Sequence, residues 1–451
     1  MHRLLRHGLG LGVLLGATAC HDTAIVVGGL QEVASLKAIP NRDLDILFVI
    51  DDSPSMTDKQ ASLAANFPRM MDALAQLDGG LPNLHIGVVT SDMGTNGGPA
   101  IGAGQGACTG VGKDGALQAS SAFTGTWISD VDDGAGGRTR NYDPAVAELP
   151  AVFTQLALVG DAGCGFEQPL AAMRRALINP ANAGFVRPEA NLAIVILTDE
   201  DDCSALGSTL FGPDSEALGP LQSFRCFEHG VVCDPDAPRE VGIKQGCVPR
   251  ADSLFVEDVQ PFVDAVLATK GDPRKVLVGA IVGDPGVVAV ELRTPSGTPQ
   301  ISLAHSCTFE GPSGPQVADP AVRLAAFLDA FTGRSTLTTI CSADLSAPLG
   351  TIGQSAKALV GDPCIDTAQL TDSLPELPGV QPACEVTDVR DSAPDAPRVI
   401  PQCASGGTDC FQFVVDPVAC PLSVDHVRLK IDRAQVVADD AWTYVRCQVA
   451  E

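Results

Sequence analysis

Continuous apolar stretches alternate along the first three quarters of the chain with segments in which apolar residues recur every three or four positions. The continuous stretches are short and rich in β-branched residues, which favours strands over helices. They are LDILFVI (44–50), LHIGVVTSD (84–92), NLAIVILTDEDD (191–202), KVLVGAIVGD (275–284) and STLTTIC (335–341). Strands with no polar alternation are buried on both faces, so the pattern predicts a parallel sheet.

Segments with helical spacing lie between these strands. In 58–77, for example, Leu63, Phe67, Leu74 and Leu77 lie on one face of a helix. The predicted helices are 58–77, 146–160, 167–178, 256–269, 320–331 and 348–359. Strands that alternate with helices predict an α/β fold with a doubly wound, mostly parallel sheet. Ligands of such sheets bind at the carboxyl ends of the strands.

The same pattern divides the chain into regions. Beyond residue 362, Pro, Asp and Cys dominate, and the apolar runs FQFVVD, HVRLKID and WTYVRCQVA are short. We expect a small disulfide-stapled β-rich module there. The predicted regions are a signal peptide (1–20), a tether (21–42), an α/β domain (43–362) with irregular insertions at about 94–120 and 203–250, and the β-rich module (363–451).

The N-terminal region has the features of an export signal. Arg3 and Arg6 precede the apolar stretch LGLGVLLGA, and small residues lead to Cys20. The sequence ATAC resembles the lipobox of bacterial lipoproteins, although Ala17 stands where Leu is usual. We expect lipidation of Cys20 and anchoring in the cell envelope, at the periplasmic or outer surface and most simply in the outer membrane. The alternative is an ordinary signal peptide that is cleaved near Ala19.

Cysteine usage also indicates an oxidising compartment. Apart from Cys20 there are 14 cysteines, and each predicted domain holds an even number, as expected if each closes its own disulfides. Zinc is the alternative, but the spacings are too wide for zinc knuckles and histidines are few. The shortest pairings are Cys233–Cys247, Cys403–Cys410 and Cys420–Cys447. The disulfide candidates are Cys108, Cys164, Cys203, Cys226, Cys233, Cys247, Cys307, Cys341, Cys364, Cys384, Cys403, Cys410, Cys420 and Cys447.

The formal net charge is −26. A surface of this sign repels phosphate backbones, so we expect no nucleic-acid partner. The 45% content of apolar residues is sufficient for a folded core, so the chain is not disordered. Charge and composition therefore indicate a folded, acidic protein, and the acidity gives no sharper indication.

Candidate chemistry lies where two predicted strands end. Asp51, Ser53 and Ser55 follow the strand 44–50, and Asp199 ends the apolar part of 191–202. Carboxylate and hydroxyl oxygens are ligands that Mg2+ prefers. The D-x-S-x-S spacing directly after a buried strand resembles the metal-ion-dependent adhesion site of the von Willebrand factor A family. The resemblance covers about residues 43–362, and it implies the α/β fold that the apolar pattern also predicts.

The resemblance implies roles for these residues. In the family the two serines coordinate the metal directly, the first Asp acts mostly through water, and a further Asp comes from a strand end that corresponds here to ILTDE and Asp199. The family usually adds a Thr from a Gly-rich loop, but the loop GDAGCGFEQPL (160–170) has none. Cys164 lies near that position, and we expect it to pair with another loop, for instance through Cys108.

Glu167 is the nearest oxygen ligand in this loop and could replace the missing Thr. The expected cofactor is a divalent cation, Mg2+ above Mn2+ or Ca2+, and an additional carboxylate would shift the preference toward Ca2+. The implied function is a non-catalytic binding or adhesion module, in which an Asp or Glu carboxylate of a protein partner completes the metal shell.

Three alternatives stay open. Ser53 or Ser55 could simply cap the following helix. The acidic strand ends could belong to a metal-dependent hydrolase, although the sequence has no G-x-S-x-G or H-E-x-x-H motif. The chain could also be a structural envelope protein in which the metal site no longer functions.

Overall fold

The computed structural model describes residues 30–39, 41–77, 79–101, 108–294, 297, 299–361, 363–368, 370–373, 381–403, 408–417, 420, 425–434 and 437–449. The predicted signal peptide, including Cys20, lies outside the described residues. Within them, no helix is both long and apolar enough to cross a membrane.

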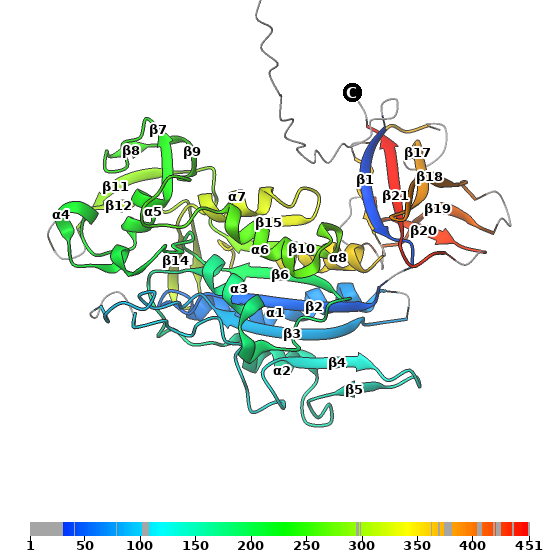
Figure 1. Ribbon diagram of the computed structural model, residues 1–451, viewed down its shortest axis with the longest axis horizontal. Helices are drawn as coiled ribbons and strands as arrows, with labels where there is room; N and C mark the ends of the chain where they lie inside the picture. The colour runs from blue at the N-terminus through cyan, green and yellow to red at the C-terminus, as the bar shows by residue number, and fades with distance from the viewer. Residues whose placement is uncertain are drawn as a thin grey trace, which may run out of the picture.

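A seven-stranded sheet forms the centre of the larger domain (Figure 1). Its strands, in spatial order, are β15 (Ser335–Thr339), β10 (Val276–Val282), β6 (Asn191–Leu197), β2 (Asp43–Ile50), β3 (Asn83–Thr90), β4 (Ile128–Asp132) and β5 (Arg138–Arg140). The five strands from β15 to β3 are parallel, and β4 and β5 are antiparallel additions at one edge. The five predicted strands and the mostly parallel α/β fold are therefore confirmed.

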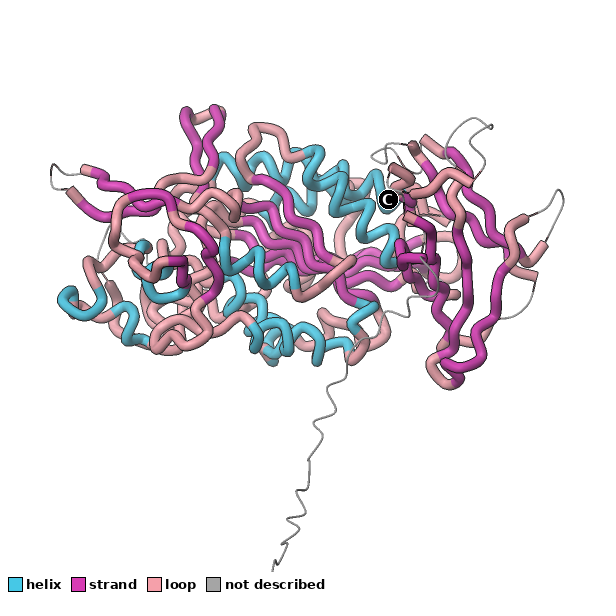
Figure 2. The backbone as a smooth tube through the Cα atoms, turned by 90° about the horizontal axis from the view of Figure 1, so that it is seen from above, coloured by secondary structure: helices cyan, strands magenta, loops and turns pink. Residues whose placement is uncertain are grey.

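Helices cover both faces of this sheet (Figure 2). One face packs against α1 (Thr57–Ala75), α2 (Leu149–Ala157) and α8 (Ser346–Val360), and the other against α3 (Pro169–Ile178), α6 (Gln260–Lys270) and α7 (Val322–Asp329). Side chains of β2 alternate between the two layers, with Phe48 in the first core and Val49 in the second. In the first core, Phe153 of α2 stacks on Phe67 of α1 with ring centroids 3.7 Å apart.

Two insertions lie at the carboxyl ends of the parallel strands. The first, predicted at 203–250, contains α4 (Ser215–Leu218), α5 (Phe224–Gly230), β7 (Val231–Asp234), β8 (Gly242–Ile243) and β9 (Gln245–Pro249). The second follows β10, where we predicted no element, and contains β11 (Ala289–Arg293), β12 (Gln300–Leu303), β13 (Cys307–Gly311) and β14 (Gly314–Ala318). The two insertions are joined, because β11 pairs with β8.

The C-terminal module consists of two small antiparallel sheets around their own core. Its strands are β1 (Leu30–Lys37), β16 (Cys364–Ile365), β17 (Cys384–Arg390), β18 (Ala393–Ile400), β19 (Cys410–Val415), β20 (Val427–Asp432) and β21 (Ala441–Gln448). β1 comes from the region 21–42 that we expected to be only a tether, and it pairs with β21 along its length. The module therefore takes one strand from the beginning of the chain.

The C-terminal module packs against the amino ends of the parallel strands, at the opposite end from the insertions (Figure 1). Arg274, just before β10, lies over the ring of Trp442 at 4.0 Å and donates a hydrogen bond to the Tyr444 hydroxyl at 2.8 Å. It also forms an ion pair with Asp391 at 2.8 Å. Trp442 is thus buried at the contact between the two domains.

Seven disulfides join the 14 cysteines that follow Cys20, and none links the larger domain to the C-terminal module. The pairs are Cys108–Cys164, Cys203–Cys226, Cys233–Cys247, Cys307–Cys341, Cys364–Cys420, Cys384–Cys447 and Cys403–Cys410. The expected pairing Cys420–Cys447 is wrong. β17 and β21 place Cys384 opposite Cys447, and β16 beside β20 brings Cys364 close to Cys420. This number of disulfides is typical of proteins outside the reducing cytoplasm.

Candidate functional site

Asp51 lies at the carboxyl end of β2, where the chain turns toward α1. Its Oδ1 accepts a hydrogen bond from the Ser53 amide at 2.7 Å, and its Oδ2 accepts one from the Thr198 hydroxyl at 2.8 Å. Burial, reinforced by the negative charge of Asp199, raises the pKa of Asp51 to about 7. The ends of β2 and β6 therefore converge, as the position of the acidic residues predicts.

Ser53 and Ser55 occupy the turn between β2 and α1. Their Oγ atoms lie 3.2 Å apart, close enough to hydrogen-bond to each other. Neither serine caps the following helix, because the N-cap residue of α1 is Met56 and no side chain makes the capping bond. The capping alternative therefore does not explain these two hydroxyl groups.

Lys59, in the first turn of α1, reaches into the same region. Its Nζ donates hydrogen bonds to Asp199 Oδ2 at 2.8 Å, to the Ser55 carbonyl oxygen at 3.0 Å and to Gln316 Oε1 at 3.2 Å. Lys59 is 1% exposed and Asp199 is 4% exposed, so the ion pair is buried. The other oxygen of Asp199, Oδ1, is buried and has no hydrogen-bond partner among the residues that the structure describes.

Further carboxyl groups adjoin Asp51 and Asp199. Glu167, in the loop before α3, is 1% exposed, and within the described part of the chain its buried Oε1 has no hydrogen-bond partner. Burial, with the negative charges of Glu200 and Asp51, raises the pKa of Glu167 well above its usual value. Glu200 hydrogen-bonds to Glu167, and burial with the charge of Asp319 raises the pKa of Glu200 to about 8.

We call the group formed by Asp51, Glu167, Asp199, Glu200 and Asp319 the acidic rim. Burial also raises the pKa of Asp319, although His305 Nδ1 lies 2.7 Å from its Oδ1 and opposes the shift. Five carboxyl groups thus lie close together at the carboxyl ends of the parallel strands. Such crowding is costly unless protons or cations neutralise it.

A second lysine neutralises the neighbouring Asp52. Lys113, from the Gly-rich loop after β3, forms an ion pair with Asp52 Oδ2 at 2.8 Å. The loop at Gly163 lies tightly against this carboxylate, because a Cβ at residue 163 would lie 2.4 Å from Asp52 Oδ1. The Cys108–Cys164 disulfide ties the two loops together. Asp52 is therefore part of the supporting structure beneath the acidic rim.

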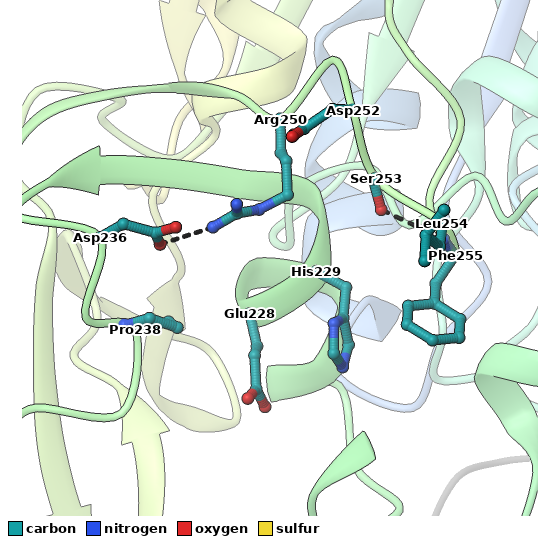
Figure 3. A pocket seen from close by; sticks show the side chains of 9 residues that line it. All are labelled: Glu228, His229, Asp236, Pro238, Arg250, Asp252, Ser253, Leu254 and Phe255. Atoms are coloured by element: carbon teal, nitrogen blue, oxygen red, sulfur yellow. Dashed lines mark hydrogen bonds and ion pairs between the residues drawn. The ribbon is translucent and has the colours of Figure 1, made fainter. Parts of the chain in front are cut away.

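Two cavities adjoin this end of the molecule. The smaller, of about 90 Å³, is bordered by Glu200 and Asp319 of the acidic rim and by Phe224 and Arg293 of the insertions. The larger, of about 320 Å³, lies within the first insertion (Figure 3). There Arg250 is paired with Asp236 at 2.6 Å, and the His229 ring contacts the Phe255 ring edge-on at 4.8 Å. None of the predicted site residues borders this larger cavity.

In the part of the chain that the structure describes, no group of three or more His, Cys, Asp or Glu side chains is arranged to hold a metal by itself. Serine hydroxyls are not among those residue types, so this finding does not cover Ser53 and Ser55. The structure brings all five predicted site residues, Asp51, Ser53, Ser55, Glu167 and Asp199, to one end of the sheet.

Sequence reasoning missed several residues of this region. Thr198 precedes Asp199 on the same strand end, so its polar side chain could have been included. Glu200 belongs to the acidic run 199–202, and such runs usually carry solvated charge, although here Glu200 lies against Glu167. Nothing in the sequence indicates that Lys59 belongs to this region, because a lysine in the first turn of a predicted helix is usually solvent-exposed. Gln316 belongs to a hairpin that we did not predict.

No protein-family model and no curated protein sequence matches this chain. Solved structures with distant similarity include the pilus adhesin SpaC from Lactobacillus rhamnosus GG, with 11% identity, a TM-score of 0.32, and coverage of 92% of this chain and 40% of that one. The pilus adhesin RrgA from Streptococcus pneumoniae has 12% identity, a TM-score of 0.30, and coverage of 93% and 58%.

A von Willebrand factor type A protein from Catenulispora acidiphila has 10% identity, a TM-score of 0.26, and coverage of 94% of this chain and 67% of that one. Of the SpaC adhesin described above, the present chain spans about 40% of the length. The fold of this chain is defined by the order and direction of its own strands.

Proposed function

We propose that this protein is a non-catalytic binding module whose acidic rim, together with Ser53 and Ser55, holds a divalent cation and presents it to a protein partner. The observation that carries the proposal is the placement of two neighbouring hydroxyl groups beside buried carboxylates at one strand end. Asp51, Ser53, Ser55, Asp199 and Glu167 are the proposed ligands.

The chemistry of these groups fits a hard cation. All five offer oxygen atoms, and the buried atoms Asp199 Oδ1 and Glu167 Oε1 have no hydrogen-bond partner in the described ranges. A buried carboxylate oxygen without a donor is costly, and a metal ion would satisfy it. Mg2+ is the expected ion, with Mn2+ or Ca2+ as alternatives. The bound ion would supply a positive charge to which an anionic group can bind.

The partner we propose is a protein that offers an Asp or Glu carboxylate. Mg2+ sites in proteins usually keep several water ligands, so a carboxylate can replace one of them. An uncharged ligand would gain less from the positive charge of the ion. The strongly negative chain makes such an ion the natural point of attachment for an acidic group.

The arrangement of the domains supports presentation of the acidic rim. β1, which begins at Leu30, lies in the C-terminal module at the amino ends of the strands, while the acidic rim lies at their carboxyl ends (Figure 1). A chain that is lipid-anchored through Cys20 would therefore carry the rim on the side away from its attachment. We propose this anchoring in the cell envelope together with the binding function. Loss of membrane partitioning in Cys20→Ala tests it.

The central test is calorimetric titration of the metal-free protein with Mg2+, Mn2+ and Ca2+. The double variant Ser53→Ala/Ser55→Ala removes two proposed ligands without changing the charge, and it should bind at least tenfold more weakly. Ser62→Ala, in the helix α1 that follows this turn, is the matched control and should bind like the wild type. Equal binding by the double variant and the control would refute the site.

Partner chemistry is tested separately with acidic peptides. Peptides that contain Asp or Glu should bind the metal-loaded protein, whereas matched peptides with Asn or Gln should not. Chelation of the metal should abolish binding. Metal binding without any preference for the carboxylate peptides would leave a metal site that does not serve adhesion. Absence of metal binding would favour the structural envelope protein.

A further inference from the structure

Lys59 supplies a cation inside the proposed metal site. We propose that the Lys59 ammonium group competes with the divalent cation, because it neutralises Asp199 in the metal-free protein and lowers the affinity of the acidic rim for metal. This inference rests on the proposed function, and it adds a control on that site by a residue of the chain itself.

The contacts of Lys59 show how the ammonium group is held. It has three protons to donate, and three acceptors lie within hydrogen-bonding distance: Asp199 Oδ2, the Ser55 carbonyl and Gln316 Oε1. The side chain is 1% exposed, so water contributes little to its solvation. In the metal-free protein, Lys59 is therefore fully satisfied in its present position.

The hydrogen-bond acceptors of Lys59 show which residues the ammonium group and a metal ion would share. Asp199 and Ser55 are both proposed metal ligands, and the ammonium group contacts the first through its carboxylate and the second through its carbonyl oxygen. A divalent cation bound by these two residues would lie close to the ammonium group in a buried region. Like charges at such a separation repel strongly when water does not screen them.

Metal binding therefore requires either that the ammonium group withdraws or that it tolerates the second charge. Lysine has a flexible four-carbon stem, which allows withdrawal. Its third acceptor, Gln316, lies on the β13–β14 hairpin, and the same hairpin contacts the N-terminal turn of α1 through Ser313 and Asp58. The hairpin of the second insertion thus helps to hold Lys59 in the competing position.

The experiment compares Lys59→Met with the wild type. Methionine keeps the length and apolar stem of the side chain but removes the charge. We expect Lys59→Met to bind Mn2+ and Mg2+ at least tenfold more tightly, equivalent to about 1.4 kcal/mol. Binding is measured by calorimetry and by the electron paramagnetic resonance signal of free Mn2+, which reports occupancy without any assay of partner binding.

Lys270→Met provides a matched control. Lys270 is also a buried lysine that faces an aspartate, Asp45 at 3.4 Å, but it lies toward the amino end of the sheet. This substitution removes the same charge and should leave metal affinity unchanged. Lys59→Arg keeps the charge and should bind metal as weakly as the wild type.

A second measurement, of thermal unfolding, shows whether Lys59→Met still folds. In chelator, Lys59→Met should unfold at a lower temperature than the wild type, because Asp199 loses its partner. Saturating Mn2+ should then raise its midpoint more than that of the wild type, since tighter ligands stabilise more. A variant that does not fold in chelator is refolded in Mn2+, and failure to fold there would overturn the proposal.

The outcomes separate this inference from the proposed function. Tighter binding by Lys59→Met alone supports the competition, even if the wild type binds no metal, in which case the metal-dependent function of the native protein fails. Equal binding by Lys59→Met and wild type overturns the competition and leaves the metal site intact. Absence of binding in every variant overturns both.

Discussion

Replacing Asp51 with Asn should make the metal-free protein more stable at pH 8, although it removes a proposed metal ligand. The pKa of Asp51 is raised from 3.8 to about 7 by burial and by Asp199. A carboxyl group with a raised pKa in the folded state binds a proton on folding. Its contribution to stability therefore falls as the pH rises from 3.8 through about 7.

The size of the stability effect follows from the difference between these two pKa values. At pH 8 the raised pKa of Asp51 lowers the free energy of unfolding by about 4 kcal/mol. At pH 5 it lowers this free energy by less than half as much. Asparagine carries no charge, but it gives up the charge-assisted hydrogen bonds from Ser53 and Thr198, which together are worth about 2 kcal/mol. We therefore expect a net gain of about 2 kcal/mol at pH 8.

The local geometry accepts the amide. Its oxygen can accept the Ser53 amide hydrogen, as Asp51 Oδ1 does at 2.7 Å. Its nitrogen can donate to the Thr198 hydroxyl, which then donates its own proton to the Glu200 carbonyl oxygen 3.2 Å away. Both hydrogen bonds that Asp51 accepts thus have a counterpart in the variant.

The assay is urea-induced unfolding in chelator at pH 5 and pH 8, followed by circular dichroism. The stability of Asp51→Asn minus that of the wild type should be about +2 kcal/mol at pH 8. It should be about 2–3 kcal/mol lower at pH 5, where Asp51 itself is protonated, so that the two proteins are then about equally stable. Saturating Mg2+ should stabilise only the wild type. A variant that is less stable than the wild type at pH 8 would refute this reasoning.

Three further predictions concern the acidic rim and the packing. Wild-type stability in chelator should fall between pH 5 and pH 8, because the pKa of Glu200 is raised to about 8, and Glu200→Gln should reduce that fall in urea titrations at the two pH values. Arg274→Ala should lower the unfolding temperature of the C-terminal module by a few degrees in calorimetry, because contacts with Trp442 and Asp391 worth about 1–2 kcal/mol are lost. An unchanged thermogram would contradict this. Phe153→Ala should lower the free energy of unfolding by about 3–5 kcal/mol in urea, since its buried ring stacks on Phe67.

The parallel sheet was predictable because its strands are buried on both faces. β2, β6 and β10 contain almost only apolar residues, and such runs fit few other structures. The convergence of Asp51 and Asp199 followed from the rule that parallel strands end at the same edge of a sheet. These inferences need only local sequence and the direction of neighbouring strands.

Long-range pairing was not predictable in the same way. β1 has the sequence LQEVASLK, in which exposed and half-buried residues dominate, and it becomes a strand by pairing with β21 at the other end of the chain. The disulfide Cys364–Cys420 depends on β16 lying beside β20, which no local pattern indicates. Proximity in sequence favoured Cys420–Cys447, whereas sheet register decided the pairing.

The basic partners of the acidic residues come from three separate parts of the chain. The sequence therefore shows the carboxylates but not the charges that balance them. Lys59 belongs to α1, Lys113 to the loop after β3, and His305 to the second insertion. Each faces one carboxylate, and Glu167 and Glu200 face each other instead. A protein that used this region only as support could replace such groups with apolar residues at little cost in stability. Buried carboxyl groups with raised pKa values at strand ends are typical of sites that bind protons or cations. Their presence here supports the proposed rim that exchanges protons for a cation.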